Sequence, residues 1–173
     1  PTAPGPWAVG LALVGVMVFV VPLIRAPWLF GSALLGALAL EPRTPPPPAQ
    51  IRLTILDVGQ GLSVVAETAH KVLVYDTGAA FGRFSAGSAI VAPALRSRGI
   101  TAVDRLVLSH ADADHSGGWA GLAEALPIGD IWVSPGHLLD VPTTTCRAGE
   151  RWVWDGVEFT ILSPGSPSAG SRN

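Results

Sequence analysis

The sequence is poor in cysteine and in charge, and both shortages narrow what the protein can be. Cys146 is the single cysteine, which excludes an intrachain disulfide. Charged residues make up 14% of the chain and the formal net charge is −2, so the overall basic character of many nucleic-acid-binding domains is missing. A polyanionic ligand would have to be attracted by a local patch or by bound metal ions. Histidine is also scarce, at 4 residues, so any cluster of histidines is informative.

The first forty residues hold a single charged side chain, Arg25. As a helix rising ~1.5 Å per residue, the apolar run Trp7–Ile24 would span ~27 Å, enough to cross a bilayer core. The second run, Ala26–Leu40, reaches just over ~20 Å and is equally compatible with an interfacial or re-entrant segment. We expect one or two transmembrane helices in residues 1–40, because the first run lacks both the polar face of a soluble helix and the basic start of a signal peptide.

A proline-rich linker is expected at residues 41–50, where Pro45–Pro48 favour an extended polyproline II spacer. The linker separates the membrane part from a soluble domain at residues 51–163. Residues 164–173 are rich in Ser, Gly and Pro and are expected to be disordered. Because the chain starts at Pro1 without a methionine, we also expect it to be a piece of a longer protein.

The soluble part alternates between strand and helix signals, which is typical of an α/β fold. Asp155-Gly156 predicts the turn of a β-hairpin within residues 150–162. Ser88 is the expected cap of a helix at residues 89–98, with Arg96 and Arg98 on its solvated face. A second helix is expected at residues 119–126, ended by Pro127. Five further strands are expected, at residues 51–56, 63–67, 71–75, 103–108 and 128–134.

Four ionisable side chains stand where the strand at 103–108 gives way to the helix at 119–126: His110, Asp112, Asp114 and His115. His110 and Asp112 share one side of an extended segment, whereas the adjacent Asp114 and His115 point apart. This spacing suits two neighbouring divalent metal ions, one for each His–Asp pair. Helix capping by Asp114 or Ser116 is the alternative, but capping alone does not explain two histidines and two aspartates in so short a stretch.

Three motifs resemble those of a known family. Residues 110–115 resemble the His-x-His-x-Asp-His signature of the metallo-β-lactamase fold, with Asp112 in the second His position. Together with Leu56–Gly61 and Val74–Gly78, this variant is similar to the C-terminal domain of ComEC-type DNA-uptake proteins. The resemblance covers residues 51–164 and implies a four-layer αββα sandwich, of which this chain holds the first half and a little more. It also implies that a bridging carboxylate and a further histidine follow Asn173.

The resemblance further implies roles around the metal site. Asp76 would orient the metal-binding loop by hydrogen bonding and would not bind metal, since ligating imidazoles need an outer acceptor. Asp57 and Gln60 are candidates for the same supporting layer, and Asp112 or Asp114 would position the attacking water. Because a carboxylate replaces an imidazole at Asp112, Mn²⁺ or Mg²⁺ is expected in preference to Zn²⁺.

A few other positions carry weaker signals. Residues 79–87 hold two phenylalanines and Arg83, which suit base stacking and phosphate contact but equally an ordinary loop. His137 is a candidate for an additional metal ligand, although a single loop histidine is more often simply exposed. His70 is expected to be a solvated turn residue, and Cys146 a small apolar filler.

The expected function is that of a metal-dependent phosphodiesterase that cleaves nucleic acid in a membrane DNA-uptake channel, as in natural transformation. Its expected partners are DNA, the lipid bilayer, the rest of the channel protein and the competence machinery. Arg25 as a cytoplasmic turn would place the soluble domain on the extracytoplasmic side of the bacterial inner membrane. Two alternatives stay open: a hydrolase of the same fold acting on lactams, thioesters or small phosphoesters, and a non-catalytic DNA-guiding module. The piece alone is expected to be inactive and to bind metal weakly.

Overall fold

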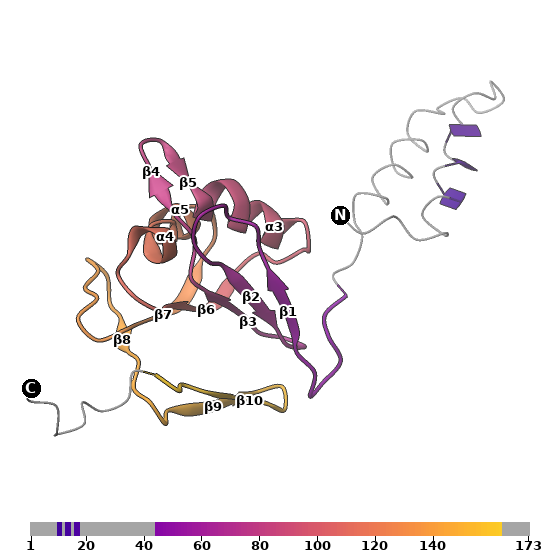
Figure 1. Ribbon diagram of the computed structural model, residues 1–173. Helices are drawn as coiled ribbons and strands as arrows, with labels where there is room; N and C mark the ends of the chain where they lie inside the picture. The colour runs from indigo at the N-terminus through magenta and orange to yellow at the C-terminus, as the bar shows by residue number, and fades with distance from the viewer. Residues whose placement is uncertain (1–9, 12, 15, 18–43, 164–173) are drawn as a thin grey trace, which may run out of the picture. The chain divides into compact units, whose positions relative to one another are not determined.

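A six-stranded mixed β-sheet organises the part of the chain from residue 44 to residue 163 (Figure 1). The structure, a computed structural model, describes residues 10, 11, 13, 14, 16, 17 and 44–163. The chain divides into two compact units, residues 1–43 and residues 44–173. Among the described residues, no helix combines the length and the apolar composition that crossing a bilayer requires. The predicted transmembrane runs and the tail at 164–173 fall almost entirely outside the described residues and stay predictions.

The strand order explains why distant motifs meet. Along the sheet the order is β1-β2-β3-β6-β7-β8, with antiparallel pairs from β1 to β3 and parallel pairs from β3 to β8. Because parallel strands end at one edge, the residues that follow β3 and β6 are brought together there. The strands are β1 (Arg52–Ile55), β2 (Val64–Glu67), β3 (Val72–Tyr75), β6 (Val103–Leu108), β7 (Ile128–Val133) and β8 (Thr144–Thr145). The five predicted strands are confirmed.

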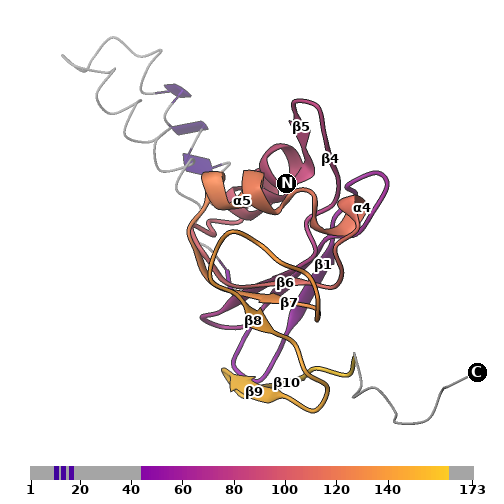
Figure 2. The ribbon, with the colours of Figure 1, turned by 90° about the vertical axis from the view of Figure 1, so that its left-hand side faces the viewer.

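Helices cover one face of this sheet (Figures 1 and 2). They are the π-helix η1 (Gly87–Val91), α3 (Ala92–Arg96) and α5 (Trp119–Ala125), while the short α4 (Ala113–Ser116) precedes α5. Val74 and Leu106 from the sheet and Leu95 and Leu122 from the helices are fully buried in one cluster. Since burial of each such side chain contributes about 1.5–3 kcal/mol, this cluster is the main core.

The prediction of a helix at residues 89–98 is wrong in two details, the capping residue and the exposure of Arg98. Ala86, not Ser88, occupies the position before η1, and no side chain caps the helix. The Ser88 hydroxyl donates to the carbonyl of Ser85 instead, at 3.3 Å. Arg98 is not on a solvated face, because its guanidinium pairs with the carboxylate of Glu67, which is 1% exposed. A buried carboxylate needs such a partner.

The other face of the sheet carries the hairpin of β9 (Arg151–Trp154) and β10 (Val157–Thr160), which confirms the predicted hairpin. Trp152 stacks on Phe159 with ring centroids 5.1 Å apart, and its ring lies 5.2 Å from that of Trp132. The Arg105 guanidinium lies 4.0 Å from the Trp132 ring centroid, so cation–π contact adds to aromatic packing.

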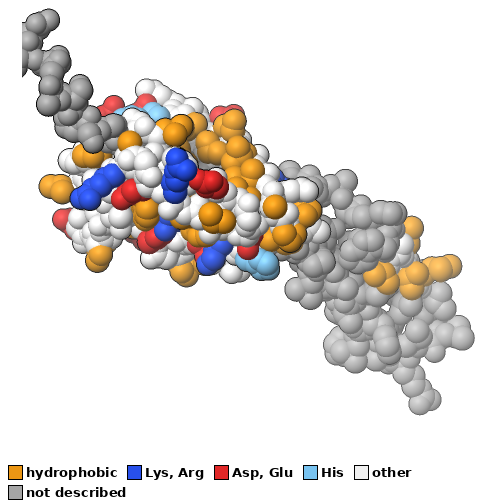
Figure 3. Space-filling view, turned by 90° about the horizontal axis from the view of Figure 1, so that it is seen from below, with side chains coloured by type: hydrophobic (Ala, Val, Ile, Leu, Met, Phe, Trp, Pro, Cys, Tyr) orange, Lys and Arg blue, Asp and Glu red, His pale blue; other side chains and the backbone are white. Residues whose placement is uncertain are grey.

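Figure 3, which views the molecule from below, shows basic and acidic side chains interspersed. Of the predicted sandwich, the described residues contain one helical layer, one sheet and this hairpin.

Asp155, in the turn of that hairpin, is hydrogen-bonded to the turn between β2 and β3. One carboxylate oxygen accepts from the Thr68 hydroxyl at 2.6 Å and from the His70 backbone N–H at 2.7 Å. The other lies 2.8 Å from His70 Nδ1. His70 is 79% exposed, as expected for a solvated turn residue, yet its ring is held by this contact.

The same turn also holds the proline-rich segment. The Ala49 N–H donates to the Asp155 carbonyl at 2.7 Å, and Arg52 Nη1 donates to the Thr44 carbonyl at 3.0 Å. Pro46 is buried. The end of the predicted extended spacer is therefore a turn that packs on the hairpin, and the segment from residue 44 belongs to the compact unit at residues 44–173.

The contacts of the Asp155 carboxylate with Thr68 and His70 make the stability of the fold depend on pH in the acid range. Hydrogen bonds from the Thr68 hydroxyl and then from His70 hold the pKa of Asp155 at about 2, below its ordinary value of 3.8. Because the folded-state pKa is the lower one, the carboxylate stabilises the fold above about pH 4, and this contribution is lost as the pH falls towards 2. We expect Asp155→Asn to be less stable than the parent at pH 5, with a difference in unfolding free energy that shrinks by pH 2. Urea denaturation at both pH values measures it; a difference independent of pH would contradict the role of the charge.

Candidate metal centre

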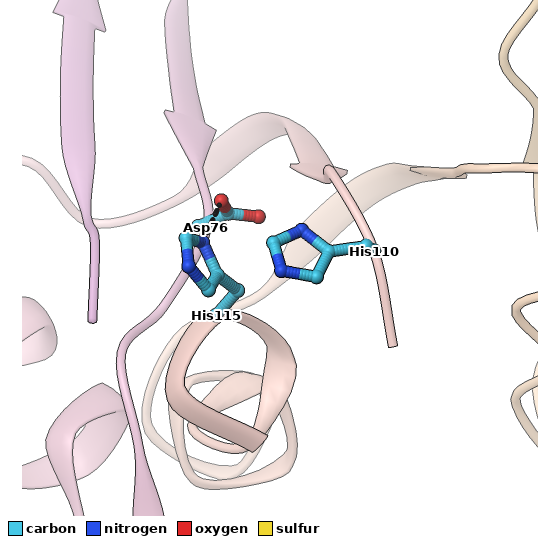
Figure 4. A group of neighbouring side chains, drawn as sticks. All are labelled: Asp76, His110 and His115. Carbon is cyan, nitrogen blue, oxygen red and sulfur yellow. Dashed lines mark hydrogen bonds and ion pairs between the residues drawn. The ribbon is translucent and has the colours of Figure 1, made fainter. Parts of the chain in front are cut away.

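Asp76 is placed by an unusual backbone turn at the end of β3. Its φ is +58°, in the left-handed region, which aspartate enters more readily than most residues. Its N–H still donates to the carbonyl of Val107 on the neighbouring parallel strand, at 2.8 Å. The side chain is fully buried. The turn thus brings its carboxylate next to the residues that follow β6 (Figure 4).

The Asp76 carboxylate is the hub of the site. Oδ1 accepts from the Ser109 backbone N–H at 2.8 Å, and Oδ2 accepts from the Ser109 hydroxyl at 2.6 Å. Oδ2 also lies 2.8 Å from His115 Nδ1. The Ser109 hydroxyl lies 2.7 Å from His110 Nδ1. Both imidazoles are therefore held through Nδ1, one directly and one through a serine, and this is the geometry that the predicted orienting role of Asp76 requires.

The hydrogen-bond network assigns the tautomers. A carboxylate only accepts, so His115 Nδ1 and the Ser109 hydroxyl both donate to Asp76. The hydroxyl has then used its proton, and it accepts from His110 Nδ1. In this network a neutral ring carries its proton on Nδ1 and presents Nε2 as a lone pair.

The two free Nε2 atoms face carboxylates. His110 Nε2 lies 3.5 Å from Asp112 Oδ2, and His115 Nε2 lies 3.9 Å from Asp114 Oδ2. A nitrogen lone pair and an anionic oxygen repel when nothing positive lies between them, whereas a shared cation converts both into ligands. The residues therefore fit divalent metal ions.

The structure brings the predicted residues together in part. The His110 and His115 rings converge, with centroids 4.0 Å apart, and together with Asp76 they offer ligand atoms that all lie within 4.8 Å of one another. Asp112 is 77% exposed and Asp114 35% exposed. The aspartates thus stand at the outer side of the imidazole pair, each beside its own histidine.

Asp57 and Gln60 do not contact the ligand side chains in the interactions that the structure describes. Both are exposed, and Asp57 Oδ1 accepts from the N–H of Gly59 at 3.1 Å, within its own turn. The backbone of this motif makes the contact instead, because the Leu62 N–H donates to the Asp114 carbonyl at 3.3 Å. A side chain on Gly61 would meet that carbonyl oxygen at 1.8 Å. The side chains of Asp57 and Gln60 therefore do not support the ligands as predicted, and the backbone at Gly61 and Leu62 contacts the ligand-bearing segment instead.

The role of Ser109 was not predicted from the sequence. The sequence contains one signal for it, a hydroxyl residue between the end of a buried strand and the first histidine. What it lacked was the parallel pairing of β3 with β6, which places Ser109 against Asp76.

Loss of the Ser109 hydroxyl is expected to free the ring of His110. In Ser109→Ala, Nδ1 of His110 loses its acceptor, so metal affinity should fall by about 10- to 100-fold, as is usual when an outer partner of a ligand is removed. Ser109→Thr keeps the hydroxyl and should retain most of the affinity. Titration calorimetry with Mn²⁺ measures the affinity, and ¹⁵N NMR of the imidazoles reports the tautomer without metal. An unchanged His110 tautomer in Ser109→Ala would show that the hydrogen bond from His110 to Ser109 does not set the tautomer.

A cavity of about 790 Å³ opens beside His110 and is also lined by Tyr75, Ser134 and Cys146. Burial, and next the charge of Asp76, raise the pKa of the Tyr75 phenol. Burial raises the pKa of the Cys146 thiol. Both groups stay neutral near pH 7, so Tyr75 is a hydrogen-bond donor in this space and Cys146 is the small filler that was predicted.

His137 is not one of the three residues that form the potential metal-binding group among the described residues. It is 8% exposed, which contradicts the simple expectation of an exposed loop histidine. Its Nδ1 has no hydrogen-bond partner among the described residues.

The comparisons with known proteins agree with the site. Residues 56–168 match the Metallo-beta-lactamase superfamily. The chain is 36% identical over 131 residues to the competence protein ComA of Neisseria gonorrhoeae, covering 76% of this chain and 18% of that protein. It is 38% identical over 110 residues to recombination protein 2 of Haemophilus influenzae, covering 63% of this chain and 14% of that protein. No solved structure matches the chain.

The chain spans less than a fifth of the length of these two relatives. The segment matched to the family contains every candidate ligand and most of the mixed sheet. The similarity to competence proteins confirms the ComEC-type resemblance of the three motifs. The chain therefore belongs to the metallo-beta-lactamase superfamily.

Proposed function

We propose that this domain is a metal-dependent phosphodiesterase that hydrolyses nucleic acid during DNA uptake. The observation that carries the proposal is the pair of imidazole Nε2 atoms, 3.5 and 3.9 Å from the carboxylates of Asp112 and Asp114. Such a donor set suits two-metal phosphoryl chemistry, in which both the attacking and the leaving oxygen need stabilisation. The superfamily match supports the coarser reading of a metal-dependent hydrolase.

Each residue of the site has a distinct task in this proposal. His110 with Asp112, and His115 with Asp114, would hold the two cations, which supply Lewis-acid polarisation and a water of lowered pKa when bound. Asp76 and Ser109 keep both rings in the ligating tautomer. Asp112, at 77% exposure, is available to accept a proton from a water or to position it.

DNA as the substrate is inferred from the relatives, which are named for competence and for recombination. By the same inference the domain would work beside the remainder of a channel protein and the competence machinery. A bilayer anchor through residues 7–40, with the domain on the extracytoplasmic side of the inner membrane, completes the proposal.

Metal restoration tests the function. After chelation, the intact protein should lose cleavage of a single-stranded oligonucleotide, and Mn²⁺ should restore it better than Zn²⁺, because the Asp112 carboxylate makes the site harder than a histidine would. Strong reactivation by Zn²⁺ alone would contradict the carboxylate argument. Cleavage of lactams or thioesters in place of oligonucleotides would favour another hydrolase of the fold. Metal-dependent DNA binding without any hydrolysis would favour a guiding module.

A further inference from the structure

Residues 79–87, expected to be a loop, fold into a small hairpin of β4 (Ala80–Phe81) and β5 (Phe84–Ser85). Phe81 is 69% exposed, and its ring lies 4.9 Å from that of Phe84 at an angle of 31°. Arg83, at the tip between them, is exposed and makes no ion pair or hydrogen bond within the described part of the chain. The tip thus presents an aromatic pair beside an unused cation.

Glycines fix the root of this hairpin against the ligand-bearing segment. A side chain on Gly117, two residues after His115, would meet the backbone nitrogen of Ala80 at 2.7 Å. Side chains on Gly118 and Gly87 would collide with each other's backbone, at 2.7 and 1.9 Å. The hairpin stands beside α4 in both views (Figures 1 and 2). Such close backbone contact leaves the root little freedom relative to the metal centre.

Folding accounts for Phe84, which packs against the main core, and for Gly82, whose φ of +57° suits the first position of the two-residue turn. It does not account for Phe81, which is 69% exposed and gains little from burial, or for Arg83, because the turn sets no requirement for a cation at its second position. The metal centre itself adds a second reason to look for a ligand, because its exposed side is acidic through Asp112 and Asp114. With a net charge of −2 over the chain, attraction of phosphates by protein charge is weak, so a polynucleotide needs another source of affinity.

We infer that the β4–β5 hairpin is a stacking platform for a base of single-stranded nucleic acid, with Phe81 and Phe84 under the base and Arg83 on a neighbouring phosphate. The inference rests on the proposed function, to which it adds the strandedness of the substrate. Stacking on aromatic rings tolerates any base, which suits a sequence-independent enzyme. Bases paired inside a duplex are not available to Phe81, so the platform discriminates against double strands.

Fluorescence anisotropy of the intact, metal-loaded protein with a labelled, hydrolysis-resistant phosphorothioate dodecamer of thymidine tests this platform. Phe81→Ala should weaken binding by about 10-fold, within the range measured for loss of one stacked base. Phe81→Trp should bind as tightly as the parent. Arg83→Gln should lower the slope of affinity against salt by about one. Binding of a blunt duplex should not respond to Phe81→Ala.

Val153→Ala provides the matched control, since Val153 is 63% exposed on the other hairpin, away from the ligands, and should leave binding unchanged. If the parent binds the single strand and Phe81→Ala binds it equally well, the platform is overturned while the proposed function stands. If the parent binds neither single-stranded nor duplex DNA, the proposed function itself fails. An equal loss on duplex and single strand would overturn the assignment of strandedness.

Discussion

Replacing His110 or His115 by alanine is expected to remove metal binding and to lower phosphodiester cleavage by at least ~100-fold in the intact protein. Each substitution deletes an Nε2 ligand and leaves an unpaired carboxylate beside the gap, at Asp112 or Asp114. DNA binding should fall much less, because it draws on surfaces outside the metal centre. Nuclease rate and bound metal, measured on the same preparations, separate the two effects.

His70→Ala is the matched control for both variants. His70 is 79% exposed and contacts Asp155 at the opposite end of the sheet, so its loss should leave the cleavage rate and the metal content unchanged. Full activity in both His110→Ala and His115→Ala would end the enzyme reading. A non-catalytic DNA-guiding module would then remain.

Gly61→Ala is expected to destabilise the domain by about 2–5 kcal/mol, from backbone strain and overpacking together. The φ of Gly61 is +116°, which alanine strongly disfavours, and its side chain would meet the carbonyl oxygen of Asp114 at 1.8 Å. Relief requires the turn to move away from the segment that carries Asp114 and His115. Metal affinity should therefore fall together with stability.

Gly59→Ala, in the same motif, separates the effect of backbone strain at a positive φ from the effect of the collision with Asp114. Gly59 also has a positive φ, +75°, but a side chain there would meet nothing within 4 Å. Its substitution should cost only about 1 kcal/mol and leave metal affinity intact. Urea denaturation and Mn²⁺ titration of both variants give the comparison. Equal losses in the two variants would show that contact with Asp114 is unimportant.

Local pattern was sufficient for the strands and for the clustering of ligands. The strand at 103–108 is apolar enough to be recognised alone, and the spacing of His110, Asp112, Asp114 and His115 is contained in the sequence. Each Nε2 lies 3.5 or 3.9 Å from the carboxylate of the neighbouring aspartate, but the two rings also converge, so one metal ion for each His–Asp pair stays a prediction. Both features depend on residues close together in the chain.

Features that depend on tertiary partners were missed. Ser88 has the chemistry of a helix cap, but the π-helix starts before it and its hydroxyl goes to Ser85. Arg98, which follows α3, has the pattern of a surface residue, yet the buried Glu67 at the end of β2 binds it. Ser109 gains its role only from Asp76, 33 residues away. None of these partners is visible within a window of local sequence.

The places where the chain enters the domain and where it binds metal lie at opposite ends of β3. Thr68 and Asp155 hold the incoming segment through Ala49 near the start of this strand, whereas Asp76 follows its end. A pulling force applied at Thr44 would first load the contacts of Ala49 and Arg52. From Arg52 the force would pass along β1, whose four residues are all paired with β2, before it reached the Leu62 N–H that donates to the Asp114 carbonyl. Because such a pair of strands resists shear, tension at Thr44 would strain the contacts of Ala49 and Arg52 before it strained the segment that carries the ligands.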